Sequence, residues 1–226
     1  MSTGIVPRVL SFDLDDTLWP VAPVIEAAER ELFGWLRAHH PRAVAGHSIE
    51  SMRELRAAVA ARHPARSHDL TFLRVTALAE QLVAGGYDEA AAQPAFEIFY
   101  AARNRVRCYA DVRPALARLA RARPLYALSN GNADLGLCGV AAYFTGHLSA
   151  RAVGAAKPDP RIFTALAARA GVEPAEILHV GDDPLADVEG ARRAGMQAIW
   201  INRDARTWPA DLAPPDRVIA DLHEIL

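Results

Sequence analysis

Residues 9–18 read Val-Leu-Ser-Phe-Asp-Leu-Asp-Asp-Thr-Leu, a short apolar run that ends in a block of acids. The apolar part predicts a buried strand over 9–12. The carboxylates of Asp13 and Asp15 follow directly and repel each other unless a positive group lies beside them. A divalent cation and a phosphoryl group would satisfy that requirement, whereas an Asp-rich turn after a strand is the simpler alternative. The rest of the chain decides between them.

The composition is that of an ordinary globular protein, with 226 residues, 51% hydrophobic content and 23% charge. A net charge of -2 and the lack of a basic stripe argue against a nucleic-acid partner. No apolar run approaches the length of a membrane span, and the first residues lack a signal-peptide core, so we expect a cytoplasmic protein without a membrane partner. Cys108 and Cys138 have no metal-type spacing, which fits a reducing compartment.

Lysine occurs once among the 25 basic residues, at position 157. Its neighbours, Ala156-Lys157-Pro158-Asp159-Pro160, are typical of a turn that enters a helix. A lysine ammonium is a compact point charge, which suits a phosphate or a carboxylate cluster better than the wide guanidinium of arginine does. Lys157 is therefore a candidate site residue.

The order of predicted elements indicates an α/β protein with an inserted helical stretch. Helices are expected over 26–38, from a capping pattern at 51–54, over 69–84, and from 88 onward, which makes residues 20–108 a helical bundle. From residue 109 the chain alternates between helices (111–121, 159–170, 184–194) and short strands (124–128, 147–149, 177–180, 198–201, 218–219). Such alternation predicts a parallel sheet with helices on both faces.

Polar residues follow three of the predicted strands. Asp13 and Asp15 follow the first, Ser129 and Asn130 follow the strand at 124–128, and Asp182 with Asp183 follows the strand at 177–180. Ligands bind beyond the carboxyl ends of the strands in open parallel sheets, so we expect these side chains to meet there, joined by Lys157 from a loop.

These residue types can carry out phosphoryl transfer. Asp13 is the expected nucleophile that forms an aspartyl-phosphate, and Asp15 the acid and base that protonates the leaving oxygen and then activates water. Oxygen ligands suit Mg²⁺, for which we expect the carboxylates of Asp13 and Asp182 and the backbone carbonyl of Asp15. Ser129, Asn130 and Lys157 are the expected donors to the phosphate.

Three further residues are expected to contact the metal ligands without binding the metal themselves. Asp187 lies five residues after Asp182, in the first turns of a predicted helix. For Asp187 and Asp183, capping of that helix is an equally good interpretation. Thr17 completes the group as a neighbour of the first two acids. Trp19, Phe72 and Tyr100 are candidates for stacking on a flavin or a base, and packing in the core is their alternative.

The motifs at Asp13-x-Asp15-x-Thr17, Ser129-Asn130-Gly131, Lys157-Pro158 and Gly181-Asp182-Asp183-x-x-x-Asp187 resemble, in order, those of the haloacid dehalogenase superfamily. The resemblance covers about 1–19 and 109–226 and implies a Rossmann-like catalytic core, with residues 20–108 as an all-helical cap domain. Asp15 resembles the phosphatase branch, since the dehalogenase branch lacks an acid there. A closer resemblance is to bacterial phosphatases of flavin mononucleotide and of a riboflavin-pathway phosphate.

We therefore expect a Mg²⁺-dependent phosphatase that acts on a small phosphate ester. Two alternatives remain open. A phosphosugar mutase would use the same aspartate but return the phosphoryl group to its substrate. A phospho-accepting signalling module would keep the phosphoryl group on Asp13 without turnover. The sequence leaves the substrate and the oligomeric state open, and a monomer is compatible with it.

Overall fold

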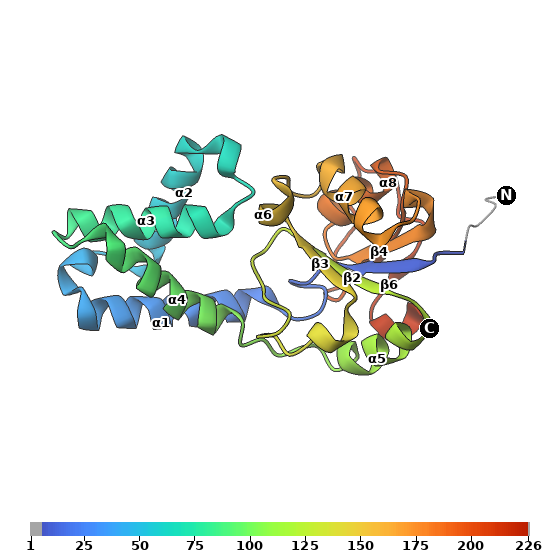
Figure 1. Ribbon diagram of the computed structural model, residues 1–226, viewed down its shortest axis with the longest axis horizontal. Coiled ribbons are helices and arrows are strands. Elements are labelled where there is room, and N and C mark those ends of the chain that lie inside the picture. The colour runs from blue at the N-terminus through green and yellow to red at the C-terminus, as the bar shows by residue number, and fades with distance from the viewer. Residues whose placement is uncertain (1–5, 226) are drawn as a thin grey trace. The chain divides into compact units, whose positions relative to one another are not determined.

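The computed structural model describes residues 6–225, which fall into two compact units (Figure 1). One unit consists of Met1–Pro20 and Arg107–Leu226, and the other of Val21–Val106. The first unit contains all the strands of the described chain, and the second is helical.

The first unit is built on a six-stranded parallel sheet in the order β3-β2-β1-β4-β5-β6. Its strands are β1 (Val9–Phe12), β2 (Leu125–Ser129), β3 (Gly146–Ser149), β4 (Ile177–Gly181), β5 (Gln197–Ile201) and β6 (Val218–Ile219). β1 and β2 are buried along their whole length, as expected for strands covered on both faces. The predicted α/β fold with a Rossmann-like parallel sheet is confirmed.

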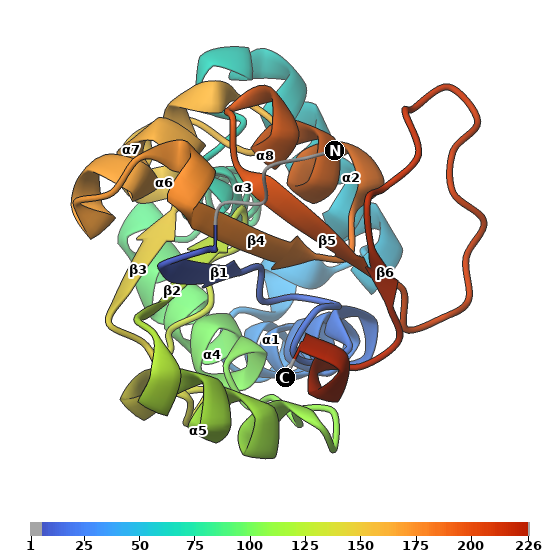
Figure 2. The ribbon, with the colours of Figure 1, turned by 90° about the vertical axis from the view of Figure 1, so that its right-hand side faces the viewer.

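Helices cover both faces of this sheet (Figure 2). α5 (Val112–Ala122) lies on one face, and α7 (Pro160–Ala170) and α8 (Gly190–Arg193) lie on the other, with the short α6 (Ala150–Val153) after β3. The helix predicted over 184–194 is present but is not α-helical throughout, because Pro184–Glu189 is π-helical and only the last turn is α8. The backbone carbonyl of Asp183 accepts from the amides of both Asp187 and Val188, which widens the turn.

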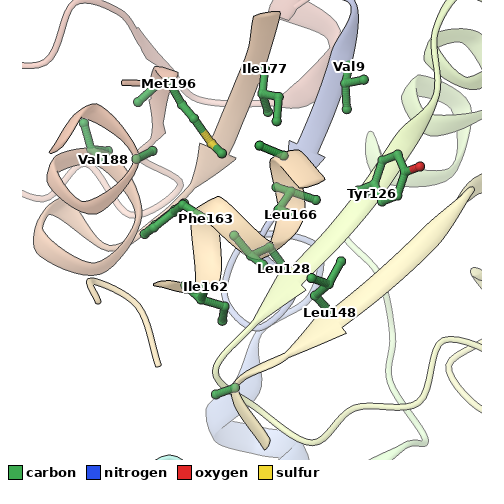
Figure 3. Packing of buried hydrophobic residues seen from close by; sticks show 14 of the residues in the cluster. Val9, Tyr126, Leu128, Leu148, Ile162, Phe163, Leu166, Ile177, Val188 and Met196 are labelled. Carbon is green, nitrogen blue, oxygen red and sulfur yellow. The ribbon is translucent and has the colours of Figure 1, made fainter. Parts of the chain in front are cut away.

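One core cluster packs α7 and α8 against the sheet (Figure 3). Ile162, Phe163 and Leu166 of α7 are fully buried, and they pack in the same cluster as Leu128 of β2 and Leu148 of β3. These α7 residues follow a helical spacing of three and four, so one stripe of the helix faces the sheet. The packing fixes the start of α7, and with it the loop that carries Lys157.

The second unit contains four helices: α1 (Val21–His39), α2 (Ile49–Arg62), α3 (Leu70–Ala84) and α4 (Ala92–Arg103). Leu32, Leu82 and Phe99 are among the buried residues of its core. Asp69 caps α3, but the predicted capping pattern at 51–54 is wrong. The capping box of α2 is formed by Ser48 and Ser51, whose side chains each accept from the other's backbone amide.

Short 3-10 turns connect these elements, at Pro41–Val44, Pro64–Arg66, Glu89–Ala91, Ala141–Tyr143, Pro174–Glu176 and Leu222–Ile225. Within residues 6–225, no helix has the length and apolar character needed to cross a membrane. Cys108 and Cys138 are both free thiols.

Candidate active site

The register of the sheet brings the polar strand ends of the first unit to one edge. Phe12 of β1 is level with Ala127 of β2 and with Val180 of β4. Asp13 follows Phe12, and its amide donates to the carbonyl of Val180 at 2.9 Å. The strand order reverses at β1, because β2 and β3 lie on one side of it and β4, β5 and β6 lie on the other. Open α/β sheets form their ligand crevice at such a switch point.

Lys157 lies at the centre of this edge. Its Nζ donates to Oδ1 of Asp13 at 2.5 Å, to Oδ1 of Asp187 at 2.6 Å and to the carbonyl of Leu128 at 2.8 Å. The lysine is buried, with 5% of its surface exposed. All three ammonium protons are thus used, and the only lysine of the chain joins three separate segments.

Burial and charge set the protonation of these groups. Burial would lower the pKa of Lys157, but the carboxylates of Asp13 and Asp187 outweigh it and raise that pKa, so the ammonium stays charged. The pKa of Asp13 is raised by burial and by the charges of Asp187 and Asp182, in opposition to Lys157. Burial would raise the pKa of Asp187 as well, but Lys157 and His179 hold it well below the ordinary value.

Asn130 positions Lys157 through the backbone. The Asn130 side chain donates from Nδ2 to the Lys157 carbonyl at 2.9 Å and accepts from the Lys157 amide at 2.7 Å. Ser129 is buried beside it, and its Oγ accepts from the amide of Gly131 at 2.9 Å. The hydroxyl proton of Ser129 has freedom to rotate toward a ligand. Phosphate binding by Asn130 and Ser129 remains a prediction.

Asp187 is held by a buried network that the sequence interpretation missed in part. Nε2 of His179 lies 3.2 Å from Oδ1 of Asp187, and Nδ1 lies 3.0 Å from Oγ of Ser11. Burial lowers the pKa of His179, so the neutral ring donates to Asp187 and accepts from the Ser11 hydroxyl. A histidine inside the otherwise apolar strand 177–180 was the signal that could have identified it.

Gly181 makes room for this carboxylate. A Cβ placed on Gly181 would lie 2.2 Å from Cγ of Asp187, a separation that atoms cannot adopt. The glycine therefore allows the strand end and the π-helical turn to approach each other. Asp183 has a different position: its carboxylate accepts from the amides of Leu185 and Ala186 and caps the helix, which is the alternative that the sequence left open.

Asp182 completes a group of three acids. One ligand oxygen from each of Asp13, Asp182 and Asp187 lies within 4.8 Å of the others. The pKa of Asp182 is raised to about 6 by burial and by the charge of Asp187, against the opposing charge of Arg206. Three clustered carboxylates with incomplete charge compensation fit a hard divalent cation with oxygen ligands, and Mg²⁺ uses one or two carboxylates in such sites.

Thr17 and two arginines outside the predicted set fix the segments around Asp182. Oγ1 of Thr17 donates to Oδ1 of Asp182 at 3.3 Å, and its supporting role at a metal site remains a prediction. Arg206 donates to Oδ2 of Asp182 at 3.0 Å. Arg203 donates to the carbonyl of Thr17 at 2.8 Å and pairs with both carboxylate oxygens of Asp111. Both arginines come from the irregular segment after β5, where periodicity gives no signal.

Asp15 lies in a tight turn that Trp19 closes. Nε1 of Trp19 donates to Oδ1 of Asp15 at 2.8 Å, and the amide of Asp16 donates to the carbonyl of Trp19 at 2.7 Å. Asp16 occupies the left-handed region at a φ of 60°, which aspartate tolerates better than most residues. Trp19 is fully buried, so it orients Asp15 and does not present a stacking face.

The other two aromatic candidates belong to the helical unit. Phe72 packs edge-on against His63 at a ring distance of 5.2 Å, and Arg66 stacks over it at 4.0 Å. Tyr100 stacks on Phe96 at 5.5 Å. Both rings pack against buried clusters of the bundle, which is the alternative given for them in the sequence analysis.

The parallel sheet, the acids at its carboxyl edge and the buried lysine define a class of hydrolase. Residues 7–195 match the family described as haloacid dehalogenase-like hydrolase, and the chain belongs to this family. The chain is thus an enzyme of the hydrolase class, as predicted.

Relatives of this chain include both phosphatases and dehalogenases. It is 37% identical to the Escherichia coli 5-amino-6-(5-phospho-D-ribitylamino)uracil phosphatase YigB. The similarity extends over 213 residues, which are 91% of this chain and 89% of that protein. A solved 2-haloacid dehalogenase from Pseudomonas syringae is 37% identical with a TM-score of 0.90, over 98% of this chain and 96% of that one. A phosphatase of the same family from Thermococcus onnurineus is 26% identical with a TM-score of 0.69, over 96% and 95%.

Proposed function

We propose that this protein is a Mg²⁺-dependent phosphatase that hydrolyses small phosphate monoesters through an aspartyl-phosphate on Asp13. The observation that carries the proposal is the contact of the Lys157 ammonium with Asp13 at 2.5 Å, beside the three-acid cluster. Such a site has a carboxylate nucleophile, a fixed positive charge and oxygen ligands for a cation, which together suit a phosphate dianion.

In the first step, the carboxylate of Asp13 attacks phosphorus and the ester oxygen leaves. Lys157 binds Oδ1, so we assign the attack to Oδ2. We assign the Ser129 hydroxyl as a donor to the phosphoryl oxygens, and the Lys157 ammonium, whose protons bond Asp13, Asp187 and Leu128, contributes its positive charge beside them. Asp13 and Asp182 would hold the cation, which supplies charge neutralisation between the carboxylate and the phosphate. Asp187 would support the reaction by holding the Lys157 ammonium beside Asp13.

Asp15 serves both halves of the reaction in this proposal. Its carboxyl group donates a proton to the departing alcohol and later accepts one from the water that cleaves the aspartyl-phosphate. The indole of Trp19 binds one oxygen of Asp15, so the other oxygen is the one assigned to proton transfer. An acid at this position also favours phosphoryl transfer over dehalogenation, because a carbon–halogen bond breaks without a proton donor.

We assign substrate selection to the helical unit Val21–Val106, as a cap on the catalytic core. The substrate that we propose is flavin mononucleotide or a ribitylaminouracil phosphate, supported by the likeness to the Escherichia coli enzyme over 91% of this chain. Two free thiols fit the cytoplasm as its compartment.

The test is a screen of the purified protein against phosphorylated metabolites, with and without Mg²⁺, that measures free phosphate. The panel includes flavin mononucleotide, sugar phosphates and phosphoserine, with 2-chloropropionate and halide detection as the dehalogenase arm. Release of phosphate only with Mg²⁺, and its loss in Asp13→Asn, is the expected result. Halide release without phosphate release would overturn the proposal. Isomer formation in place of phosphate release would indicate a mutase, and a stable acyl-phosphate without turnover a signalling module.

A further inference from the structure

The helical unit contains a buried ionic cluster that the phosphatase proposal does not use. Glu29 of α1 is 4% exposed and lies against three arginines of α2 and α3. Its carboxylate accepts from Nε of Arg53 at 2.7 Å and from Arg56 at 3.1 Å, and it lies 3.6 Å from Arg74. The cluster joins three of the four helices of this unit.

Positive charge exceeds negative charge in this cluster. Three guanidinium groups surround one buried carboxylate, and Glu50 pairs with one of them, Arg53, at the surface. The Arg74 side chain is only 11% exposed and stacks 3.5 Å over the ring of Phe99. Burial first, and then the charge of Arg56, lower the pKa of Arg74 to about 9, in opposition to the charge of Glu29.

A cavity of about 20 Å³ opens beside these charges. Glu29, Arg56, Arg74 and Gln81 line its polar part, and residues such as Leu32 and Met52 line the rest. That volume holds one or two water-sized groups, since about 10–15 Å³ suffices for one. Gln81 is 5% exposed, and its Nε2 has no hydrogen-bond partner within the part of the chain that the structure describes.

We propose that this cavity binds a small anion of the size of chloride. The groups around it include two guanidinium groups and the amide nitrogen of Gln81 as donors, and the carboxylate of Glu29 is already bound by arginines. A water molecule there accepts two hydrogen bonds at most, and it carries no charge to offset the guanidinium groups. An anion accepts from all the donors and offsets the excess charge, so it stabilises the bundle.

The proposal predicts saturable chloride binding by the full-length protein. We would measure the ³⁵Cl NMR line width as chloride replaces gluconate at constant ionic strength. The expected result is excess broadening that saturates and that bromide displaces. In Gln81→Glu, which places a negative charge at the cavity, affinity should fall at least about tenfold, the loss of one charge-assisted hydrogen bond. Gln93→Glu makes the same change on the exposed face of α4 and should bind chloride as the wild type does.

Excess broadening that never saturates in the wild type would overturn the proposal, and so would undiminished binding by Gln81→Glu. If Gln81→Glu fails to fold by circular dichroism, Arg56→Gln replaces it, because that side chain is 29% exposed and its removal leaves Arg53 and Arg74 to pair with Glu29. Wild-type affinity in folded Arg56→Gln would equally contradict an anion held by this cavity.

Discussion

The indole nitrogen of Trp19 donates a hydrogen bond to the carboxylate of Asp15, with 2.8 Å between Nε1 and Oδ1. The two residues are four apart and belong to one tight turn, in which the amide of Asp16 bonds the carbonyl of Trp19. Trp19 is completely buried, so its ring cannot follow the carboxylate into another rotamer. The contact therefore fixes the acid that we propose for proton transfer.

Trp19→Phe should lower kcat for phosphate release by about ten- to a hundredfold with little change in KM. The substitution keeps a buried ring but removes one hydrogen bond to a charged group, about 1.5–3 kcal/mol, from the proton-transfer residue. Steady-state kinetics with a generic aryl phosphate measures the effect. Trp35→Phe, in α1, is the matched control and should retain wild-type kcat. Equal losses in both variants would show that the Trp19 contact has no special role.

Lys157→Met should destabilise the protein by about 3–5 kcal/mol when divalent cations are removed. The substitution leaves the carboxylates of Asp13 and Asp187 buried without the Lys157 ammonium that both of them bind. Urea unfolding in the presence of a chelator measures the free energy of unfolding. Exposed Arg121→Met should stay within about 0.5 kcal/mol of the wild type. A stable Lys157→Met would mean that the two carboxylates are not charged together.

Gly181→Ala should abolish phosphatase activity and lower stability by at least about 1–3 kcal/mol. The new methyl group would fall 2.2 Å from Cγ of Asp187 and would push that carboxylate away from Lys157. Activity and thermal unfolding are both measured. Gly34→Ala, where a Cβ meets nothing within 4 Å in α1, is the control and should be neutral or slightly stabilising. An active Gly181→Ala would show that activity does not depend on the position of Asp187 beside Lys157.

Acid should unfold the helical unit in part through Glu29. Burial would raise the pKa of Glu29, but hydrogen bonds from Arg53 and Arg56 and the charge of Arg74 lower it below its ordinary value of 4.5. The folded state therefore binds this proton more weakly than the unfolded state does. The contribution of ionised Glu29 to the free energy of unfolding is present above pH 4.5 and is lost as the pH falls through the pKa of the folded state.

The measurement is the free energy of unfolding against pH for the wild type and Glu29→Gln. The wild type should lose stability more steeply below pH 4.5 than the variant, which lacks the titrating group. Glu80→Gln removes an exposed partner of Arg62 and should change stability by less than about 1 kcal/mol. Parallel curves for the wild type and Glu29→Gln would refute the role of Glu29.

The central contact of the site was predictable because it follows from the topology of a parallel sheet. Asp13 and Lys157 are 144 residues apart, yet the rule that strand ends share one edge, with a single lysine in a turn before a helix, predicted their neighbourhood. The strands at 9–12 and 218–219 were predicted with the bounds that the structure has. Local periodicity predicted the strands, and the polar residues at the strand ends predicted the location of the site.

Other features depend on tertiary contacts that no periodicity records. The helix expected over 184–194 begins as a π-helical turn, within which the Asp187 side chain bonds Lys157 and His179. His179 lies within the predicted strand 177–180, but its position in the sequence does not indicate its contact with Asp187. Arg203 and Arg206 reach Thr17 and Asp182 from an irregular segment, where only the folded chain shows which residues meet.

The central claim is that Asp13 carries the phosphoryl group, and acid-quench mass spectrometry tests it most directly. Wild-type protein is mixed with Mg²⁺ and a rapidly cleaved aryl phosphate, quenched within the first turnover, digested and mapped. We predict one phosphoryl group on the peptide that contains Asp13, and neither label nor turnover in Asp13→Asn. A label on another residue, or phosphate release by folded Asp13→Asn at near the wild-type rate, would contradict the account.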